Sequence, residues 1–409
     1  MAEVWIIDGV RTPRGKGKPT GALHHVHPQE LLAQVLRALT ERTGIDPADV
    51  DDVVVGNADQ RDDHGDDIAR LAVLLAGWPI EVPGVTLNRF CGSGQQAVTF
   101  AAMGIAAGWQ HLVVAGGVES MSRYRPRSGG PALDGGNPAL RARYPLVPQG
   151  ISADLIATLE GFTRADVDAF ALRSQQKAAK AIADGRFANS IIPVRDADGN
   201  VLLDRDEHPR PETTAESLAA LEPAFARMGT KIREPEGLSY DQMCLQVYPQ
   251  LSKIDHVHHA GNSSGVVDGA SVMLLSSPEY AKAHGLRPRA RVVATAVAGA
   301  EPVIMLTAPG PASEKALRQA GMTVADIDLW EINEAFAAVV LASMRDLGVD
   351  HERVNVNGGA IAVGHPLGAS GFRLVLTLAH EMRRRGAELG LAAICGGGGQ
   401  GGALLLRRP

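Results

Sequence analysis

Short apolar runs and longer stretches of helical period alternate along the first 120 residues. The apolar runs, which we predict to be strands, lie at 3–8, 53–55, 85–88 and 111–115. The stretches with apolar residues every three or four positions, which we predict to be helices, lie at 27–42, 66–76 and 93–107. Strands that alternate with helices in this way are typical of an α/β fold with a mostly parallel sheet.

The first two helices carry signals for their ends and for their buried faces. Pro28 lies in the first turn of one helix, and Gly44 follows its last turn. In the next helix we expect Ile68, Leu71 and Leu75 to face the core.

From about residue 121 this pattern is lost. The segments 122–148 and 229–253 have little periodicity, so we expect both to be loop. Thr163, with Asp166 three residues later, resembles a capping box at the start of a helix that runs to Asp184. A hairpin with its turn at 198–199 is predicted within 191–203.

After residue 260 the first pattern returns. Predicted strands lie at 270–276, 291–298, 328–332, 354–357, 389–395 and 403–406. Predicted helices lie at 311–320, 335–347 and 369–385. The chain therefore reads as two βαβ-rich halves with an insertion late in the first half.

The two halves look like copies of one unit. The stretch 44–51 matches 321–328, the pair Ser93-Gly94 matches Ser370-Gly371, and the strand beginning at 112 matches the strand beginning at 389. The members of all three pairs are 277 positions apart, as Asp49 and Asp326 of the first pair show. A repeat with one constant offset indicates a duplication, and we expect the copies to pack about a pseudo-two-fold axis.

Cys91 is the first candidate for chemistry, because it lies between a predicted strand and the third helix. The free N–H groups and the positive dipole end of a helix stabilise a thiolate, so we expect a lowered thiol pKa and rapid alkylation. Small residues along the helix suggest that it is packed on every side. On this stretch alone, an inert cysteine in front of a core helix fits equally well.

The repeat supplies a partner for this cysteine. The segment of the second copy that corresponds to the approach to Cys91 contains His365. If the two helix starts meet at the axis, the pair makes a nucleophile and its base. The second copy also places Asn333 and Cys395 at the carboxyl ends of strands, where open α/β sheets bind their ligands.

Composition narrows the class of protein. The chain has 409 residues, 46 glycines and only 4% aromatic residues, which indicates a large core packed through small residues. Its net charge of −6 argues against nucleic acid or an anionic membrane as a partner. Three cysteines make no disulfide framework, and no signal peptide or spanning apolar run is present. We expect a soluble, cytoplasmic protein.

Four motifs, NRFCGSG, NEAFA, GHPLGASG and CGGGGQGG, stand in this order, and AGNSSGVVDGA occupies 260–270. Together they closely resemble the thiolase family of acetyl-CoA acyltransferases, and the match runs from IIDGVRTP to the last strand. The resemblance implies a five-layer α/β/α/β/α fold of two duplicated βαβαβαββ halves with an inserted loop domain. The N-terminal half would be 1–120 with 261–287, the CoA-binding insertion 121–260, and the C-terminal half 288–409.

The resemblance also implies roles for residues at the matching positions. Cys91 would be the acyl-accepting nucleophile, His365 its base, and Cys395 a second acid/base at the α-carbon of the acetyl unit. Asn333 would hold a water that forms an oxyanion hole with His365. The backbone N–H groups of Cys91 and Gly397 would form a second oxyanion hole.

CoA would be a co-substrate, with no permanently bound cofactor and no metal. The resemblance implies that Ser264 hydrogen-bonds the pantetheine arm of CoA. The expected assembly is a homodimer or a homotetramer.

The chain departs from the family pattern in three places. Pro148-Gln149-Gly150 replaces a Met-Gly segment that borders the acyl pocket, and the link at 229–256 is lengthened. Both changes affect the acyl pocket, and Gln149 would need an oxygen or a water beside it. An acidic run at 59–67 has no interpretation.

Other functions fit these residues less well. A dinucleotide fingerprint at 396–401 has only eight residues after it, too few for the required helix and strand. The histidines at 24–27 and 256–259 lack ligand spacing, so solvated or packing roles fit better than metal. The run 59–67 lacks the alternating ligands of a calcium loop, so we interpret it as a solvated loop. Cys244 has no glycine-rich turn beside it, so we expect it to have a structural role.

We therefore predict a degradative thiolase that cleaves a 3-ketoacyl-CoA with CoA through an acyl-cysteine. Its acyl group would be larger or more oxygenated than acetoacetyl, in fatty-acid or steroid-type β-oxidation. The alternatives are an acetyl-CoA acetyltransferase that forms acetoacetyl-CoA, a ketoacyl-synthase-like condensing enzyme, and a non-catalytic CoA- or lipid-binding protein. Cys395 argues against the synthase, which uses histidine in the matching role.

Overall fold

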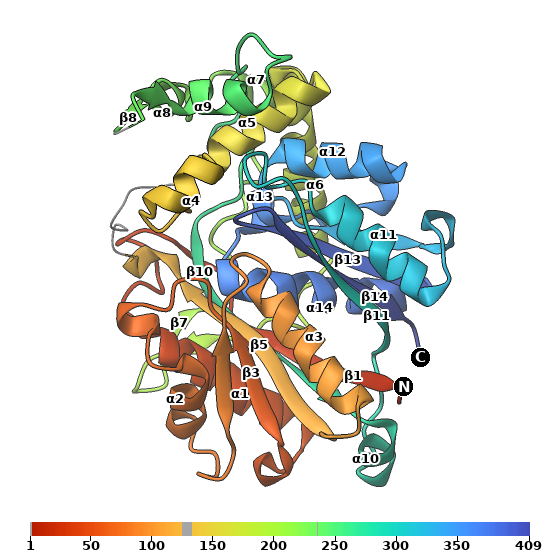
Figure 1. The fold of residues 1–409 in the computed structure, drawn as a ribbon. Helices are drawn as coiled ribbons and strands as arrows, with labels where there is room; N and C mark the ends of the chain where they lie inside the picture. Colours follow the sequence, from red (N-terminus) through yellow and green to blue (C-terminus); the bar gives the residue numbers. More distant parts are fainter. Residues whose placement is uncertain (1, 125–132, 235) are drawn as a thin grey trace.

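The computed structural model describes residues 2–124, 133–234 and 236–409, and its strands form two groups (Figure 1). The first group has the order β4 (Gly84–Leu87), β3 (Asp52–Gly56), β5 (Leu112–Ser120), β10 (Val267–Ser276) and β1 (Val4–Arg11). The second has the order β12 (Leu329–Ile332), β13 (Leu389–Gly396), β14 (Gln400–Arg407) and β11 (Ala290–Gly299). A short antiparallel pairing of β1 with β11 joins the groups edge to edge, and β2 (Gly15–Lys16) pairs with β10.

Helices lie between the two groups and on their outer faces (Figure 1). The central helices α3 (Ser93–Ala106) and α14 (Leu367–Arg385) pack on each other, and each contacts strands of both groups. The first group is covered by α1 (Pro28–Thr43) and α2 (Ile68–Leu75), and the second by α11 (Pro309–Ala320) and α12 (Ala337–Leu347). The expected α/β/α/β/α architecture is therefore confirmed.

The duplication is visible in two matching contacts, each between an aspartate side chain and the N–H groups at the start of a strand. Asp51 accepts from the N–H groups of His111 and Leu112, and Asp328 accepts in the same way from Glu388 and Leu389. Each aspartate precedes one strand and fixes the start of the neighbouring strand. The two contacts are related by the offset of 277 found in the sequence.

The central helices approach each other at two equivalent glycines. A Cβ on Gly94 would lie 2.4 Å from the carbonyl oxygen of Gly368, and a Cβ on Gly371 would lie 2.5 Å from the backbone nitrogen of Gln95. Since no side chain fits at these distances, the contact between the halves requires glycine at both positions.

In the inserted region, helices alternate with loops and two short hairpins. The hairpin that contains Val194 packs on the first half, whereas most helices of the region lie away from the sheets (Figure 1). Its helices are α4 (Pro138–Arg143), α5 (Gln149–Glu160), α6 (Arg164–Ala183), α7 (Ala215–Ala219), α8 (Ala226–Gly229) and α9 (Tyr240–Val247). Its hairpins are β6 (Val194–Arg195) with β7 (Val201–Leu203), and β8 (Ile232–Arg233) with β9 (Leu238–Ser239). The capping box at Thr163 and the turn at Gly199 are confirmed. The domain boundaries stay a prediction.

The expectation of loop at 122–148 and 229–253 was wrong in part, and 125–132 lie outside the described residues. Asn137 caps α4 through the N–H of Ala139, and Ser239 and Gln242 cap each other at the start of α9. Helices this short are fixed by their caps and by packing, which hydrophobic periodicity does not reveal.

Two further expectations in the halves were wrong. In α2 the buried residues are Ile68, Ala69, Ala72 and Val73, whereas Leu71 is half-buried and Leu75 is 47% exposed. Small alanines form the packed face, which a search for large apolar residues misses. The segment 354–357 is not a strand. The Asn355 side chain bonds both the N–H and the carbonyl of Ile332, so these groups are not available for backbone pairing with a further strand.

Two short helices complete the described elements, α10 (Pro278–Ala283) and α13 (Ala360–Val363). Across the described ranges, no helix combines the length and the apolar character that crossing a membrane requires.

Candidate active site

Cys91 lies on a tight turn between β4 and α3. Ser93 fixes this turn, since its hydroxyl accepts from the N–H of Arg89 and donates to the carbonyl of Phe90 at 2.6 Å. Phe90 has φ of 50°, a left-handed conformation that is costly for an aromatic residue. The cysteine is therefore held at a strained elbow in front of the helix, as expected.

The sulfur of Cys91 is buried and faces three hydrogen-bond donors. The Gln149 side chain and the backbone N–H groups of Cys91 and Gly397 lie close to it, and their positive ends lower its pKa. Burial outweighs them and raises the pKa of Cys91 to about 11, with a smaller contribution from the negative charge of Glu119. The expectation of a lowered thiol pKa was therefore wrong for the free protein, because desolvation exceeds the effect of the helix start.

Gly397 lies in the turn between β13 and β14. A Cβ there would be 2.4 Å from the Leu133 side chain and 3.2 Å from the Phe90 ring, so only glycine fits beside Cys91. The next two residues, Gly398 and Gly399, have φ of 73° and 77°, which the turn requires. The glycine-rich segment brings a backbone N–H to the sulfur.

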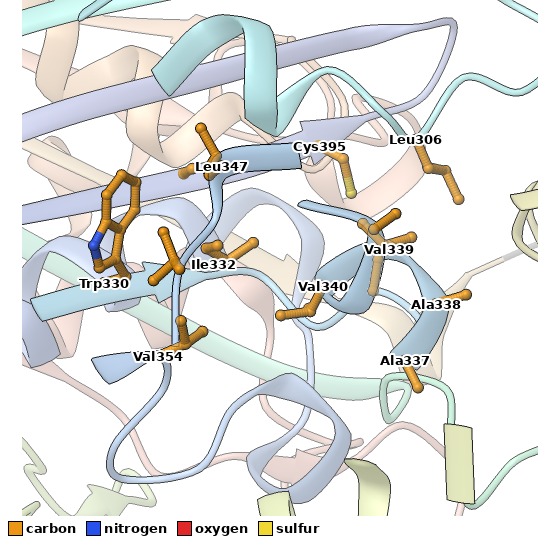
Figure 2. Packing of buried hydrophobic residues seen from close by; sticks show 14 of the residues in the cluster. Leu306, Trp330, Ile332, Ala337, Ala338, Val339, Val340, Leu347, Val354 and Cys395 are labelled. Carbon is orange, nitrogen blue, oxygen red and sulfur yellow. The ribbon is translucent and has the colours of Figure 1, made fainter. Parts of the chain in front are cut away.

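Cys395 is a buried residue near the end of β13, next to apolar side chains from β12 and α12 (Figure 2). Burial raises the pKa of its thiol, and the nearby charge of an ionised Cys91 raises it further. The two thiols are therefore electrostatically coupled, and Cys395 is protonated at neutral pH.

His365 and Asn333 are in direct contact. The Asn333 side-chain nitrogen lies 3.3 Å from His365 Nε2, and His365 Nδ1 lies 2.6 Å from the Ser370 hydroxyl. Ser370 donates to the carbonyl of Pro366 and therefore accepts from Nδ1–H. This series of hydrogen bonds assigns the proton to Nδ1 and leaves a lone pair on Nε2.

Burial lowers the pKa of His365 to about 3, and the positive charges of Arg373 and Arg14 act in the same direction. The imidazole is therefore neutral in the resting protein. A neutral ring whose Nε2 lone pair meets only the long contact with the Asn333 amide can accept a proton from a thiol. Sequence reasoning missed Ser370, although a hydroxyl residue five positions after a histidine, at the start of a helix, was the available signal.

Asn333 and Ser264 lie on adjacent turns. The N–H of Ser264 donates to the carbonyl of Ala335, two residues after Asn333. The Asn333 side-chain oxygen is buried and has no hydrogen-bond partner within the described residues, so it can accept from a bound water. Ser264 itself is half-buried.

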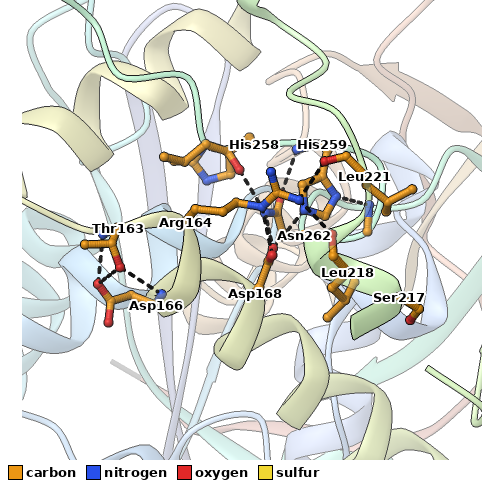
Figure 3. Close-up of polar contacts among 12 residues, drawn as sticks. Thr163, Arg164, Asp166, Asp168, Ser217, Leu218, Leu221, His258, His259 and Asn262 are labelled. Atoms are coloured by element: carbon orange, nitrogen blue, oxygen red, sulfur yellow. Dashed lines mark hydrogen bonds and ion pairs between the residues drawn. The ribbon is translucent and has the colours of Figure 1, made fainter. Parts of the chain in front are cut away.

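The histidine-rich segment before Ser264 makes hydrogen bonds from its histidines to buried carboxylates. His259 Nε2 bonds to Asp168 at 2.8 Å, and Asn262 bonds to the same carboxylate oxygen (Figure 3). His258 bonds to Asp154 at 2.7 Å. Burial lowers the pKa of His256, but Asp154 and Asp241 on either side raise it to about 9. These contacts anchor the Ser264 segment to α5 and α6, and the described residues contain no group suited to a metal ion.

The geometry brings predicted residues together in two groups, which suits them to acyl transfer through a thiol. Cys91 lies near Gly397 and Gln149, while His365 contacts Asn333. Glu119 connects the two groups, because it lies near Cys91 and accepts from the N–H of Gly368, three residues after His365.

Comparison with known proteins agrees with this arrangement. The family described as "Thiolase, N-terminal domain" matches residues 4–232, and "Thiolase, C-terminal domain" matches residues 286–408. A "Beta-ketoadipyl-CoA thiolase" of Pseudomonas aeruginosa is 44% identical over 99% of both chains. An "Acetyl-CoA acetyltransferase" of Thiocystis violacea is 43% identical over 98% of both chains.

A solved structure is also similar over the whole chain. The crystal structure of the Bacillus anthracis acetyl-CoA acetyltransferase has a TM-score of 0.83 and 39% sequence identity. The similarity covers 100% of this chain and 99% of that one.

We predict slow, strongly pH-dependent alkylation of Cys91 in the free protein. Because its pKa is raised to about 11, the thiolate fraction should grow about tenfold per pH unit from about pH 7 to about pH 10. Iodoacetamide labelling followed by peptide mass spectrometry measures the rate, and Cys91→Ser gives the background from Cys244 and Cys395. Cys91 should still be labelled first, since its pKa is raised less than those of the others. A plateau already reached at about pH 8 would contradict the raised pKa.

Proposed function

The chain belongs to the thiolase family, and from this premise we propose that it cleaves a 3-ketoacyl-CoA with free CoA into acetyl-CoA and a shortened acyl-CoA. The reaction passes through an acyl group on Cys91. The observation that carries the proposal is that Cys91 is buried on a strained elbow in front of α3, with the Gly397 turn packed against its neighbour Phe90.

Acylation begins with proton transfer from Cys91 to His365. The sulfur then attacks the 3-keto carbon, and the negative charge on its oxygen is held by the N–H groups of Cys91 and Gly397. A raised thiol pKa supports this order, since the thiolate forms only when the neutral imidazole accepts its proton.

Collapse of this intermediate breaks the bond between C2 and C3. The released acetyl-CoA enolate carries its charge on the thioester oxygen, where His365 Nε2–H and a water held by Asn333 stabilise it. Cys395 donates the proton that C2 requires, because His365 is engaged with the oxyanion. The Cys395 thiolate then takes the proton of the CoA thiol, and the CoA thiolate attacks the acyl-Cys91 thioester. The shortened acyl-CoA leaves, and His365 returns its proton to the released Cys91 thiolate.

The CoA co-substrate reaches Cys91 past Ser264. We place the pantetheine arm there because Ser264 lies on the turn beside Ala335 and next to Ser263, whose hydroxyl is buried without a partner in the described chain. No metal and no resident cofactor take part in the proposed steps.

We propose that the acyl group carries an oxygen, as in β-ketoadipyl-CoA. The Gln149 amide is near enough to the Cys91 sulfur to lower its pKa, so the first atoms of a bound acyl group would lie beside this amide. A thioester sulfur is a weak acceptor, and an amide left unpaired costs about 1–3 kcal/mol. The nearby Phe225, packed on Gly150, and Leu133, packed on Gly397, offer no polar group. The relative named as a β-ketoadipyl-CoA thiolase supports the same choice.

Synthesis of acetoacetyl-CoA from two acetyl-CoA is the second candidate. It is favoured by the similarity to proteins named acetyl-CoA acetyltransferase. Both reactions use the same acyl-Cys91 intermediate and differ in the size and polarity of the group that the pocket accepts.

We also propose that the protein is a homo-oligomer formed through β4 and α3. β4 ends the sheet order and is only half-buried, so it presents unpaired backbone groups to a second copy. Apolar side chains are exposed nearby, at Val85, Phe100, Met103 and Trp109. The expectation that α3 is packed on every side was wrong for the single chain, and a partner copy would cover this face.

Loss of Cys395 should separate the two half-reactions. Cys395→Ala should still accept an acyl group on Cys91, because that step needs only His365 and the N–H groups. Proton exchange at the acetyl methyl and condensation should fall roughly 10²–10⁴-fold. Labelling of Cys91 by acetyl-CoA and deuterium exchange measured by NMR test the two steps. Exchange at the wild-type rate would assign the proton to another group.

Replacement of Gln149 should change substrate preference. Wild type should show a higher kcat/KM for β-ketoadipyl-CoA than for straight-chain 3-ketoacyl-CoA of similar length, and Gln149→Met should reduce that ratio by about 5- to 100-fold, since one unpaired amide costs about 1–3 kcal/mol. The control is Gln250→Met, an exposed glutamine of the same region. A wild type that prefers acetoacetyl-CoA, with no change in the variant, would favour the second candidate.

A charge on the exposed face of α3 should break the oligomer. Met103→Glu should sediment as a monomer at concentrations where wild type does not, because burying an unpaired charge opposes association. Ile232→Glu, on an equally exposed apolar residue of β8, is the matched control. Unchanged sedimentation of Met103→Glu, or a monomeric wild type, would exclude this interface.

A further inference from the structure

His365 lies in the loop between α13 and α14. Neither helix has a side-chain cap at its own N-terminus. His365 follows α13, whose N-cap is Gly359, and precedes α14, whose N-cap is Pro366. Neither glycine nor proline has a side chain that accepts a hydrogen bond, so the first N–H groups of both helices need an acceptor from elsewhere.

Glu119 supplies the acceptor for α14 from the other half of the molecule. One of its carboxylate oxygens accepts from the N–H of Gly368, in the first turn of α14, and from the N–H of Ala58, both at 2.8 Å. The other oxygen accepts from the Asn57 side chain and the N–H of Asp59. The carboxylate is fully buried at the end of β5 and ties the loop after β3 to the loop of His365.

Glu334 supplies the acceptor for α13. One of its oxygens accepts from the N–H of Ile361 at 3.1 Å and from the Ser174 hydroxyl at 2.6 Å, and the other from the Asn355 side chain. Glu334 is buried and directly follows Asn333. One turn therefore carries both Asn333, which contacts His365 Nε2, and Glu334, which caps α13.

We propose that Glu119 and Glu334 are positioning residues, a pair of buried carboxylates that cap the helices on either side of His365 and hold its imidazole in place. The proposal rests on the proposed roles of Cys91 and His365. Neither carboxylate touches the reacting atoms. Each acts through backbone N–H groups that lie three or four residues from His365.

The donors around the two side chains favour their ionised forms, whereas burial raises the pKa of both. A carboxylate accepts from all the donors around it, whereas a protonated acid or an amide turns one donor toward them. Burial raises the pKa of Glu119 to about 7, while its hydrogen bonds oppose that shift. A negative charge also suits the positive end of a helix.

The geometry explains why a loop so rich in glycine can hold a base precisely. A Cβ on Gly359 would lie 2.2 Å from the Glu334 carboxyl carbon, and one on Gly368 would lie 2.5 Å from the carbonyl of Gly56. The loop therefore packs directly on Glu334 at Gly359 and on the backbone of Gly56 at Gly368. Displacement of a catalytic group by about 1 Å can cost about 100-fold in rate, so loss of one cap should be visible in kcat.

The test uses Glu119→Gln, Glu119→Asp and Glu334→Gln in the full-length protein. Glutamine keeps the shape and loses the charge, while aspartate keeps the charge but is too short to reach Gly368. We expect each variant to lower kcat about 10- to 100-fold, with kcat normalised to the fraction of Cys91 that acetyl-CoA labels. The KM for CoA should stay within about threefold of wild type, since no CoA contact is changed.

Alkylation of Cys91 by iodoacetamide gives a second readout, independent of turnover. Removal of the Glu119 charge lowers the thiol pKa, so Glu119→Gln should be alkylated several-fold faster than Glu119→Asp at the same pH. Simple loosening of the fold would speed both variants equally. Asp8→Asn, a buried carboxylate that accepts from the N–H of Gly9 and from the Arg289 side chain away from the site, controls for loss of stability alone.

Two results would overturn the proposal. One is a Glu119→Asp variant with wild-type kcat, which would show that contact with Gly368 is not needed. The other is a fall in kcat of Asp8→Asn equal to that of the three Glu119 and Glu334 variants. Failure of the proposed function is distinguishable, because wild type itself would then take no acetyl group on Cys91.

Discussion

The backbone contact between α3 and α14 is the constraint on which the site depends. Gly94 and Gly371 allow the two helices to approach within a distance that excludes any side chain. Because Cys91 precedes one helix and His365 the other, this contact brings the catalytic ends of two separate halves together. The duplicated sequence thus produces one site at the junction of its copies, with the nucleophile from the first and the base and second thiol from the other.

Burial sets the chemistry of that site. It raises the pKa of the Cys91 thiol and lowers the pKa of the His365 imidazole, so both groups are neutral at rest. The ion pair forms only when the reaction moves a proton between them, and backbone N–H groups already face the sulfur. Fixed donors in a dry site stabilise the developing charge without reorganisation, which is the main source of catalysis in such sites.

The sequence predicted what is periodic or encoded in a motif. The long helices, the repeat, and the placement of Cys91, Asn333 and Cys395 at the ends of strands follow from spacing alone. The short helix α9 and the irregular backbone at Asn355 were missed because caps and side-chain bonds outweigh hydrophobic pattern there. The sign of the Cys91 pKa shift was also missed, since it depends on how much of the molecule covers the sulfur.

The central claim is that Cys91 carries the acyl group and that His365 makes it reactive. The most direct measurement is peptide mass spectrometry after incubation with acetyl-CoA alone, for wild type and for His365→Ala. The account predicts an acetyl group on the Cys91 peptide of wild type, removed again by free CoA, and none on the variant. Acetylation of another residue, or equal acetylation of Cys91 in the variant, would contradict it.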